Sequence, residues 1–318
     1  LYTYLEWARR RGVEIRHGAA VTRVLTDAKG RARGVEYYAN GERHEQPADL
    51  VVLAASFIQN PRILLASGES RRPGGGTNPG LANSSGTLGR YLLADAMGFA
   101  YGLFDEPTEI HMGVNSGQYY HHSGLRHPGK PELFGGFQWQ IGPAAKPNDI
   151  FGVAITRPDL WGEPLHAFVR DATRHLAYMV GFAGGAPHAE NRIELDPSRR
   201  DANGMPLART VHRHDADTLA LVEHVKAQGL AVMKAAGART AWNGPLAGGH
   251  LSGGTIMGAD PAASVCDTYG RTHDVPNVLV AGAGLFPQAG GTSPTYTLHA
   301  VALRSADHVA GNWRDYAA

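Results

Sequence analysis

The feature that most constrains the fold of this 318-residue chain is a continuous apolar run at residues 50–55. A strand without polar alternation is buried on both faces, as in a parallel sheet covered by helices. Two alternating runs at residues 20–27 and 32–39 precede it, and the Asn40-Gly41 pair predicts a hairpin turn into a third strand. A meander, a buried strand and a following helix together predict an α/β layer in the first part of the chain.

The middle of the chain has a different pattern. Strand-like runs over residues 96–210 are interrupted by Gly and Pro, which is typical of a large antiparallel sheet with long loops. Residues 215–236 predict an amphipathic helix that Gly237 ends. The predicted inward face of this helix carries Leu219, Val222, Val225, Leu230 and Met233. An α+β region is therefore expected after the α/β layer.

Composition narrows the functional classes. The chain is 43% hydrophobic and 19% charged, as an ordinary globular protein is, and its formal net charge of +1 favours neither nucleic acid nor an anionic membrane. The single cysteine, Cys266, excludes an internal disulfide and a cysteine metal cluster, and is expected to be a small buried side chain. No apolar run has membrane-spanning length. The start at Leu1 fits a fragment or a processed chain, so the compartment stays unassigned.

The last quarter of the chain carries the residues suited to chemistry. His250 precedes a Gly-Gly-Thr turn at residues 253–255, and histidine is the side chain whose ordinary pKa suits proton transfer near neutral pH. The glycines let the backbone pass close to a flat ligand. A Ser-Pro pair at residues 293–294 then precedes an Ala/Leu-rich helix to about residue 310. Serine at the N-cap and proline at the first helical position are a favoured helix start.

This C-terminal segment, with Asp260-Pro261, Asp267 and residues 276–280, resembles the signature of the glucose–methanol–choline (GMC) flavoprotein oxidoreductases. Residues 54–68 similarly resemble the second sequence signature of that family. The resemblance extends over nearly the whole chain and is weakest over residues 100–185.

The resemblance implies a mixed α+β and α/β fold with two domains. Residues 1–95 and 245–318 would form portions of an FAD-binding domain of the two-dinucleotide-fold type, and residues 96–244 a substrate-binding domain on an antiparallel sheet. The FAD-binding domain would be incomplete, because the family's N-terminal G-x-G-x-x-G turn, which binds the FAD pyrophosphate, does not occur here. The glycines within residues 282–284 do not replace it, since Pro287 stands at the third glycine position. A second polypeptide or a missing N-terminal segment would supply this turn.

Two catalytic residues are implied by the resemblance. His250 would take the hydroxyl proton of an alcohol while hydride leaves the carbon for flavin N5. Ser293 stands where the family usually has Asn or His, as the second polar partner of the substrate oxygen. A serine hydroxyl can donate or accept a hydrogen bond but is no base at neutral pH. Contact with substrate and capping of the last helix are both compatible with Ser293.

Cofactor contacts are implied on three segments. The residues concerned are Val21, Ala281, Gly282, Ala283, Thr292, Pro294 and Thr295. In the family, the first of these pairs its backbone with adenine, although an ordinary core valine fits the sequence equally well. The segment 281–283 would pass the pyrophosphate or ribityl chain and bind through backbone amides, because the acidic residue and serine that the family often has there are absent. The start of the last helix would stabilise negative charge on reduced flavin.

We expect no metal site. His121-His122 and His212-x-His214 could be drawn as metal ligands, but no acidic or cysteine partner stands at convincing ligand spacing, which favours solvated surface histidines. Aromatic residues of the middle segment could line a sugar pocket together with Gln138, or could equally belong to the core of the sheet. They include Tyr119, Tyr120, Phe137 and Trp139.

The function implied is FAD-dependent oxidation of a sugar or other alcohol hydroxyl to a carbonyl. Residues 255–258 and 271–277 look most like those of bacterial sugar dehydrogenases of the family, which would pass electrons to an acceptor protein or a quinone. Pyranose-oxidase-like members, which use oxygen, are the nearest alternative. A non-catalytic or sugar-binding subunit without flavin is another. The sequence leaves the substrate and the electron acceptor open.

Overall fold

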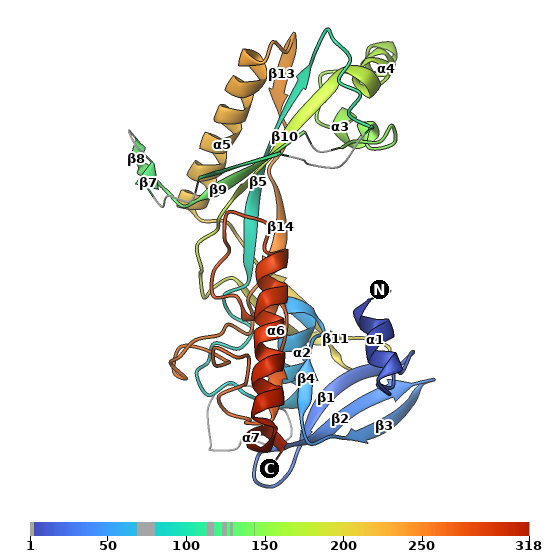
Figure 1. Ribbon diagram of the computed structural model, residues 1–318, viewed down its shortest axis with the longest axis vertical. Helices are drawn as coiled ribbons and strands as arrows, with labels where there is room; N and C mark the ends of the chain where they lie inside the picture. Colours follow the sequence, from blue (N-terminus) through green and yellow to red (C-terminus); the bar gives the residue numbers. More distant parts are fainter. Residues whose placement is uncertain are drawn as a thin grey trace.

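The computed structural model describes residues 3–68, 80–112, 118–122, 126–127, 130–142 and 144–317. The molecule is elongated, with two parts arranged along its long axis (Figure 1). The lower part in that view contains both ends of the chain, and the upper part is built on one large sheet. Strands β5 (Leu93–Leu103) and β14 (Ala247–Ser252) run side by side between the two parts.

The lower part begins with a short helix and an antiparallel meander, as the sequence predicts. The elements are α1 (Tyr4–Arg10), β1 (Ala20–Thr26), β2 (Ala32–Ala39) and β3 (Glu42–Pro47), with β2 in the centre. Asn40 and Gly41 connect the last two strands with φ angles of 52° and 81°. Two-residue hairpin turns require positive φ angles at both central residues, and the Asn-Gly pair readily adopts such angles.

Strand β4 (Val51–Leu53) pairs in parallel with β15 (Val278–Val280), which confirms the predicted parallel strand. Val51 and Leu53 are buried and pack in one core cluster with residues of helix α2 (Ser56–Ser67). The expected burial on both faces is wrong for the described residues, because Val52 points the other way and is 52% exposed. One face of this parallel pair is therefore open in the part of the chain that the structure describes.

The sheet of the upper part has the strand order β13-β5-β10-β9-β6, with β14 paired to the lower stretch of β5. All of these pairs are antiparallel, as expected for the middle of the chain. The strands not yet defined are β6 (Gln118–His122), β9 (Phe137–Ile141), β10 (Leu176–Ala183) and β13 (Thr240–Asn243).

Helix α5 (Ala216–Ala235) covers one face of this sheet (Figure 1). It begins at the N-cap Asp215, whose carboxylate accepts a hydrogen bond from the Thr218 amide at 2.8 Å. Gly229 allows a close approach to the sheet, since a Cβ there would lie 2.5 Å from the Trp139 ring. The buried residues of helix α5 are Thr218, Leu221, Val222, Val225, Gly229 and Met233. Leu219 was predicted to point inward, but it is 40% exposed. The buried face of the helix starts at Thr218 and repeats every three or four residues, which leaves Leu219 outside it.

The remaining elements complete the two parts. Helices α3 (Ile150–Ala154) and α4 (Glu163–His175) pack at the top of the view around a core cluster that includes Phe168 and Leu176. The short hairpin β7 (Arg126–His127) and β8 (Lys130–Phe134) lies at one side of the sheet. In the lower part, β11 (Arg192–Arg200) and β12 (Pro206–Val211) form a hairpin, and α6 (Thr295–Gly311) and α7 (Trp313–Ala317) follow β15.

Helix α6 is the predicted Ala/Leu-rich C-terminal helix, and it is unusually exposed. Ser305 is its only buried residue, whereas Tyr296 is 92% and Leu303 is 63% exposed. No helix in the described ranges has both the length and the apolar character that crossing a membrane requires.

Candidate active site

His250 lies on β14, at the place where the two parts of the molecule meet. In the pairing of β14 with β5, Gly249 lies opposite Asp95 and Ser252 opposite Leu93, so β14 has one residue more than β5 between these pairs. This irregularity is a β-bulge, which re-aims the side chain at the bulged position. His250 accordingly has a φ angle of 41°, an uncommon value for a residue with a side chain.

The imidazole of His250 is held by a buried carboxylate. Its Nδ1 lies 2.5 Å from Oδ2 of Asp95, and the other carboxylate oxygen, Oδ1, accepts a hydrogen bond from the Gly249 amide at 2.9 Å. Asp95 is fully buried, whereas the His250 side chain keeps 27% of its surface exposed. The sequence analysis missed Asp95, although a lone carboxylate inside the apolar run of residues 92–104 was a signal that could have identified it.

Phe182, near the end of β10, packs its ring 5.1 Å from that of His250, centroid to centroid. Two residues later the chain meets the segment that leads into α6, since a Cβ on Gly184 would lie 3.1 Å from the Gly291 amide nitrogen. A Cβ on Gly291 would in turn overlap the carbonyl oxygen of Gly136. Glycines therefore let the segment before α6 pack closely against the lower end of the sheet, next to the end of β10, the strand that carries Phe182.

A cavity of about 380 Å³ lies at this docking point. Its lining includes Thr292, one of the predicted cofactor-binding residues, together with Asp217 and Thr218 from the start of α5. The rest of the lining is largely glycine backbone from the β9 and β10 ends and from residues 290–291. Thr292 from the lower part and Asp217 and Thr218 from the upper part therefore line the same cavity, whose other walls are mostly glycine.

Ser293 is exposed and lies directly before α6, which begins at Thr295. The structure differs here from the expected Ser N-cap, because Pro294 occupies the cap position and no side chain caps the helix. The first helical bond runs from the Leu298 amide to the Pro294 carbonyl at 2.9 Å. Proline is accommodated since the cap amide needs no partner inside the helix. The Ser293 hydroxyl is left without a capping role.

The predicted cofactor segment 281–283 and the glycine turn after His250 are joined by hydrogen bonds. The Gly253 amide donates to the Ala283 carbonyl at 3.0 Å, and the Thr255 amide donates to the Gly284 carbonyl at 3.1 Å. Gly284 must be glycine, because a Cβ there would lie 2.5 Å from the Thr255 hydroxyl oxygen. The structure therefore brings together two segments that the sequence linked only through family resemblance.

Gly282 is the one residue of the cofactor segment with a special backbone conformation. Its φ angle of 102° favours glycine, and a Cβ there would meet no atom within 4 Å. It begins the short 3-10 turn η2 (Ala283–Leu285) that follows β15. The backbone at Gly282 is thus open to a close-packed ligand.

Val21 belongs to β1, where the pairing with β2 is irregular, and it is 37% exposed. It lines a shallow, mainly apolar cavity of about 380 Å³ together with residues of β4, on the side where Val52 is exposed. Among the described residues, Val21 is therefore not a core side chain. Val21 and β4 share one open surface.

Other candidates from the sequence are not part of this arrangement. Phe137 and Trp139 are each 2% exposed and belong to the core beneath α5, which confirms the core alternative for these two. The side chains of Tyr119 and Tyr120 lie outside the described residues, as do those of His121 and His122. Within the described ranges, no group of three or more His, Cys, Asp or Glu side chains is arranged to hold a metal ion.

Cys266 is fully buried, as predicted. Burial, with a smaller contribution from the neighbouring Asp267, raises the pKa of its thiol. A thiol that stays protonated is a poor nucleophile, so Cys266 is a packing residue.

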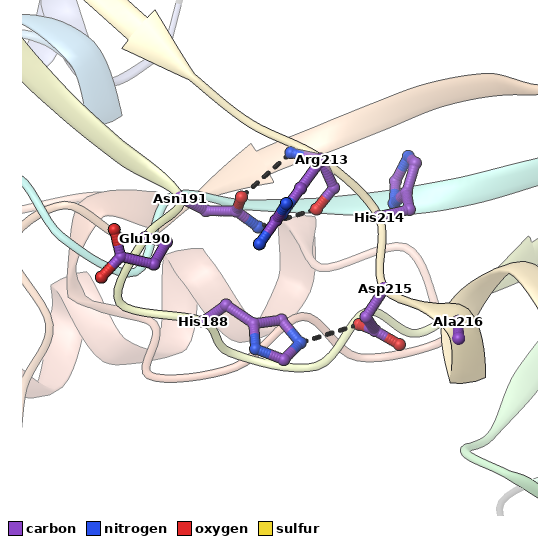
Figure 2. A pocket seen from close by; sticks show the side chains of 7 residues that line it. All are labelled: His188, Glu190, Asn191, Arg213, His214, Asp215 and Ala216. Carbon is purple, nitrogen blue, oxygen red and sulfur yellow. Dashed lines mark hydrogen bonds and ion pairs between the residues drawn. The ribbon is translucent and has the colours of Figure 1, made fainter.

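A third pocket, of about 320 Å³, lies where the chain passes from the β12 hairpin into α5 (Figure 2). His188 Nε2 lies 3.0 Å from Oδ2 of Asp215, and the Asn191 side chain bonds both the amide and the carbonyl of Arg213. Burial alone would raise the pKa of Asp215, but hydrogen bonds from Thr218 and His188 outweigh it and lower that pKa. These groups are engaged with one another, so the pocket fixes the start of α5.

Comparison with known proteins identifies the class and the family. Two family models, both described as GMC oxidoreductase, match residues 1–90 and 187–302, which together exceed half of the chain. The class that both models describe is oxidoreductase. Within that class, this chain belongs to the GMC oxidoreductase family.

Two curated relatives are similar over most of the chain. One is 2-methyl-1,2-propanediol dehydrogenase of Mycolicibacterium austroafricanum, 29% identical over 96% of this chain and 55% of the relative. The other is the gluconate 2-dehydrogenase flavoprotein of Pantoea cypripedii, 29% identical over 92% of this chain and 50% of the relative. The chain spans about half the length of these relatives.

A solved structure shows the same fold. Pyridoxine 4-oxidase from Mesorbium loti superposes with a TM-score of 0.61 over 92% of this chain and 57% of that chain, at 14% identity. At this identity the likeness bears on the fold alone, and it agrees with the mixed helix and sheet fold predicted from the sequence.

Proposed function

We propose that the chain forms the substrate side of an FAD-dependent enzyme that oxidises a sugar or other alcohol hydroxyl to a carbonyl, with His250 as the base. The observation that carries this proposal is the position of His250. It is held by a buried carboxylate, and its strand leads into a turn hydrogen-bonded to the cofactor segment 281–283. A histidine fixed at the edge of a cofactor segment is arranged for proton transfer.

The residues present fit an FAD molecule lying along this junction. The backbone at Gly282 is open, and together with Ala281 and Ala283 it would line the pyrophosphate or ribityl chain. Val21 lines the open cavity beside β4 and would lie near adenine. When bound, FAD supplies the hydride acceptor, which no amino-acid side chain can provide.

The chain's own residues would handle the proton and the charge. His250 would take the substrate's hydroxyl proton on Nε2, since Nδ1 faces Asp95. The exposed hydroxyl of Ser293 would give the substrate oxygen a second hydrogen bond. Thr292, Pro294 and Thr295 surround the N-terminus of α6, where free backbone amides favour negative charge.

A further segment is needed to complete this site. The face of β4 that carries Val52 is open, and α6 exposes Tyr296 and Leu303. The exposure of these apolar side chains beside the proposed site favours a segment that covers them. We propose that the covering piece is a second polypeptide or an N-terminal segment bearing the G-x-G-x-x-G turn, and that residues 1–95 and 245–318 complete an FAD-binding domain with it. Residues 96–244 would form the substrate domain.

Both curated relatives described above are named dehydrogenases, which favours an acceptor protein or a quinone over oxygen as the electron acceptor. Oxygen consumption by the reduced enzyme distinguishes the oxidase alternative. A flavin absorbance band in the complete protein argues against a subunit that only binds sugar.

The test is the reduction of bound flavin by substrate in the complete protein. His250→Ala should slow this step by ~10²–10⁴-fold, the usual contribution of a general base, with FAD content unchanged. His166→Ala is the matched control, because His166 is an exposed residue of α4 at the far end of the molecule. Near-normal single-turnover reduction in His250→Ala would remove His250 from the mechanism.

A further inference from the structure

The pairing of His250 with Asp95 has a consequence for the proton on the imidazole ring. Asp95 is fully buried on β5, and both of its carboxylate oxygens are engaged, one by the Gly249 amide and one by His250 Nδ1. An ionised carboxylate only accepts hydrogen bonds, so the ring nitrogen that faces it must carry a proton.

We propose that Asp95 is the positioning residue of this site: it holds His250 in the tautomer protonated on Nδ1, so that Nε2 presents its lone pair to the substrate hydroxyl. This inference rests on the proposed function, in which His250 is the base. The proton taken from the hydroxyl goes to Nε2, and the resulting imidazolium is stabilised by the negative carboxylate of Asp95 at 2.5 Å.

The backbone supports the same role. One carboxylate oxygen bonds the Gly249 amide, and the other bonds the ring of the next residue. Asp95 therefore fixes both the strand on which His250 stands and the rotation of its ring. His250 lies at the bulge with a φ angle of 41°, a conformation that costs energy unless the surroundings hold it. Phe182 packs against the ring from β10.

Asp95→Asn separates this role from a structural one. In this variant the oxygen of the new side-chain amide would keep the Gly249 amide as its donor, which leaves the NH₂ group facing Nδ1 of His250. An NH₂ group donates, so Nδ1 would have to accept and the ring proton would move to Nε2. The backbone is expected to stay in place while the base acquires the wrong tautomer.

The direct measurement is the tautomer of His250 by ¹⁵N NMR of histidine-labelled protein, with its signals assigned by their loss in His250→Gln. This readout needs no bound FAD. The wild-type protein at a pH where the ring is neutral should show protonated Nδ1 and bare Nε2, and Asp95→Asn should show the reverse. Protonated Nε2 in the wild type overturns the proposal, even if Asp95→Asn fails to fold.

The second measurement is single-turnover flavin reduction in the complete protein. Asp95→Asn should lose ~10²–10⁴-fold in rate, comparable to the effect of the same change in histidine–aspartate pairs of hydrolases, with the substrate dissociation constant little changed. Asp196→Asn is the matched control, because Asp196 is another buried carboxylate whose partners, Ser198 and Arg199, lie in the same element, β11. It should change neither the tautomer nor the rate.

The results separate the two proposals. A normal reduction rate or an unchanged tautomer in Asp95→Asn overturns the role of Asp95. A normal rate in His250→Ala rejects His250 as the base and with it the catalytic role of Asp95. In that case a protonated Nδ1 in the wild type would show only that the carboxylate orients the ring.

Discussion

At the scale of single residues, Ser293 is where the structure most changes the interpretation of the sequence. It lies before α6 but does not cap it, because Pro294 occupies that position. A polar side chain at this place that serves no helix is available to a ligand.

Replacement of Ser293 tests this directly. Ser293→Ala should alter the free energy of unfolding by less than ~0.5 kcal/mol, as surface substitutions do. Ser293→Asn, the family's usual residue, should preserve or raise the rate of flavin reduction. Ser293→Asp should fold normally but disfavour the reduced flavin, because a carboxylate would stand where negative charge develops. Thermal unfolding and the flavin reduction potential are the measurements. If Ser293→Asn abolishes turnover with FAD still bound, the substrate oxygen is held by another group.

At the scale of elements, the start of α5 depends on one carboxylate. Asp215 caps the helix and pairs with His188. The pKa of Asp215 is lower in the folded protein than its ordinary value of 3.8. Because the folded-state pKa is the lower one, the ionised carboxylate stabilises the folded protein at any pH above the pKa of the unfolded state. This stabilisation is lost as the pH falls through the pKa of the folded state.

Two variants separate the cap from the charge. Asp215→Ala should lose about 1 kcal/mol of unfolding free energy from the cap alone at pH 7. Asp215→Asn keeps a good capping group and should lose less. The stability difference between the wild type and Asp215→Asn should shrink as the pH is lowered through and below the ordinary carboxyl range. Denaturant unfolding at several pH values measures it, and a difference independent of pH would contradict the charged role.

The contact of α5 with the sheet tests packing against helix propensity. Gly229→Ala should favour the helix by about 1 kcal/mol. The new Cβ would lie 2.5 Å from Trp139 and 2.7 Å from Ala100, both in the core, and overpacking of this kind costs about 1–3 kcal/mol. We expect a net loss in unfolding free energy. Ala231→Gly, at an exposed position of the same helix, measures the propensity effect alone. A higher unfolding free energy in Gly229→Ala would show that Trp139 and Ala100 shift to accept the new methyl group at little cost.

At the scale of the whole molecule, the surfaces around the proposed cofactor site are exposed among the residues that the structure describes. The open face of β4, the cavity that Val21 lines and the helix α6 all belong to the lower part (Figure 1). The sequence contains no G-x-G-x-x-G motif, the turn that binds a pyrophosphate at a helix start.

FAD retention should therefore depend on the completing segment. We expect the chain expressed alone to carry little FAD, and co-expression with a segment bearing the G-x-G-x-x-G turn to give stoichiometric FAD and a higher melting temperature, since binding to the folded state stabilises it. Flavin absorbance and thermal unfolding measure both. Stoichiometric FAD in the chain alone would overturn this expectation. A completing segment whose glycines are replaced by valine is the control.

The sequence by itself determined the local elements and the family. The apolar run of β4, the Asn-Gly hairpin turn and the end of α5 at Gly237 depend on neighbours in the chain, and residues 250–258 carried the family motif. What the tertiary structure decided is which groups meet. Asp95 and His250 are 155 positions apart along the chain, and only the bulged pairing of β5 with β14 joins them. Val52 is exposed because none of the described residues packs on its face of β4. Pro294 replaces Ser293 at the cap because the backbone of the folded chain, and not the local preference for serine, decides where α6 begins. A sequence pattern predicts which helix or strand a segment can form. Burial and side-chain contacts arise only when segments distant in the sequence pack together.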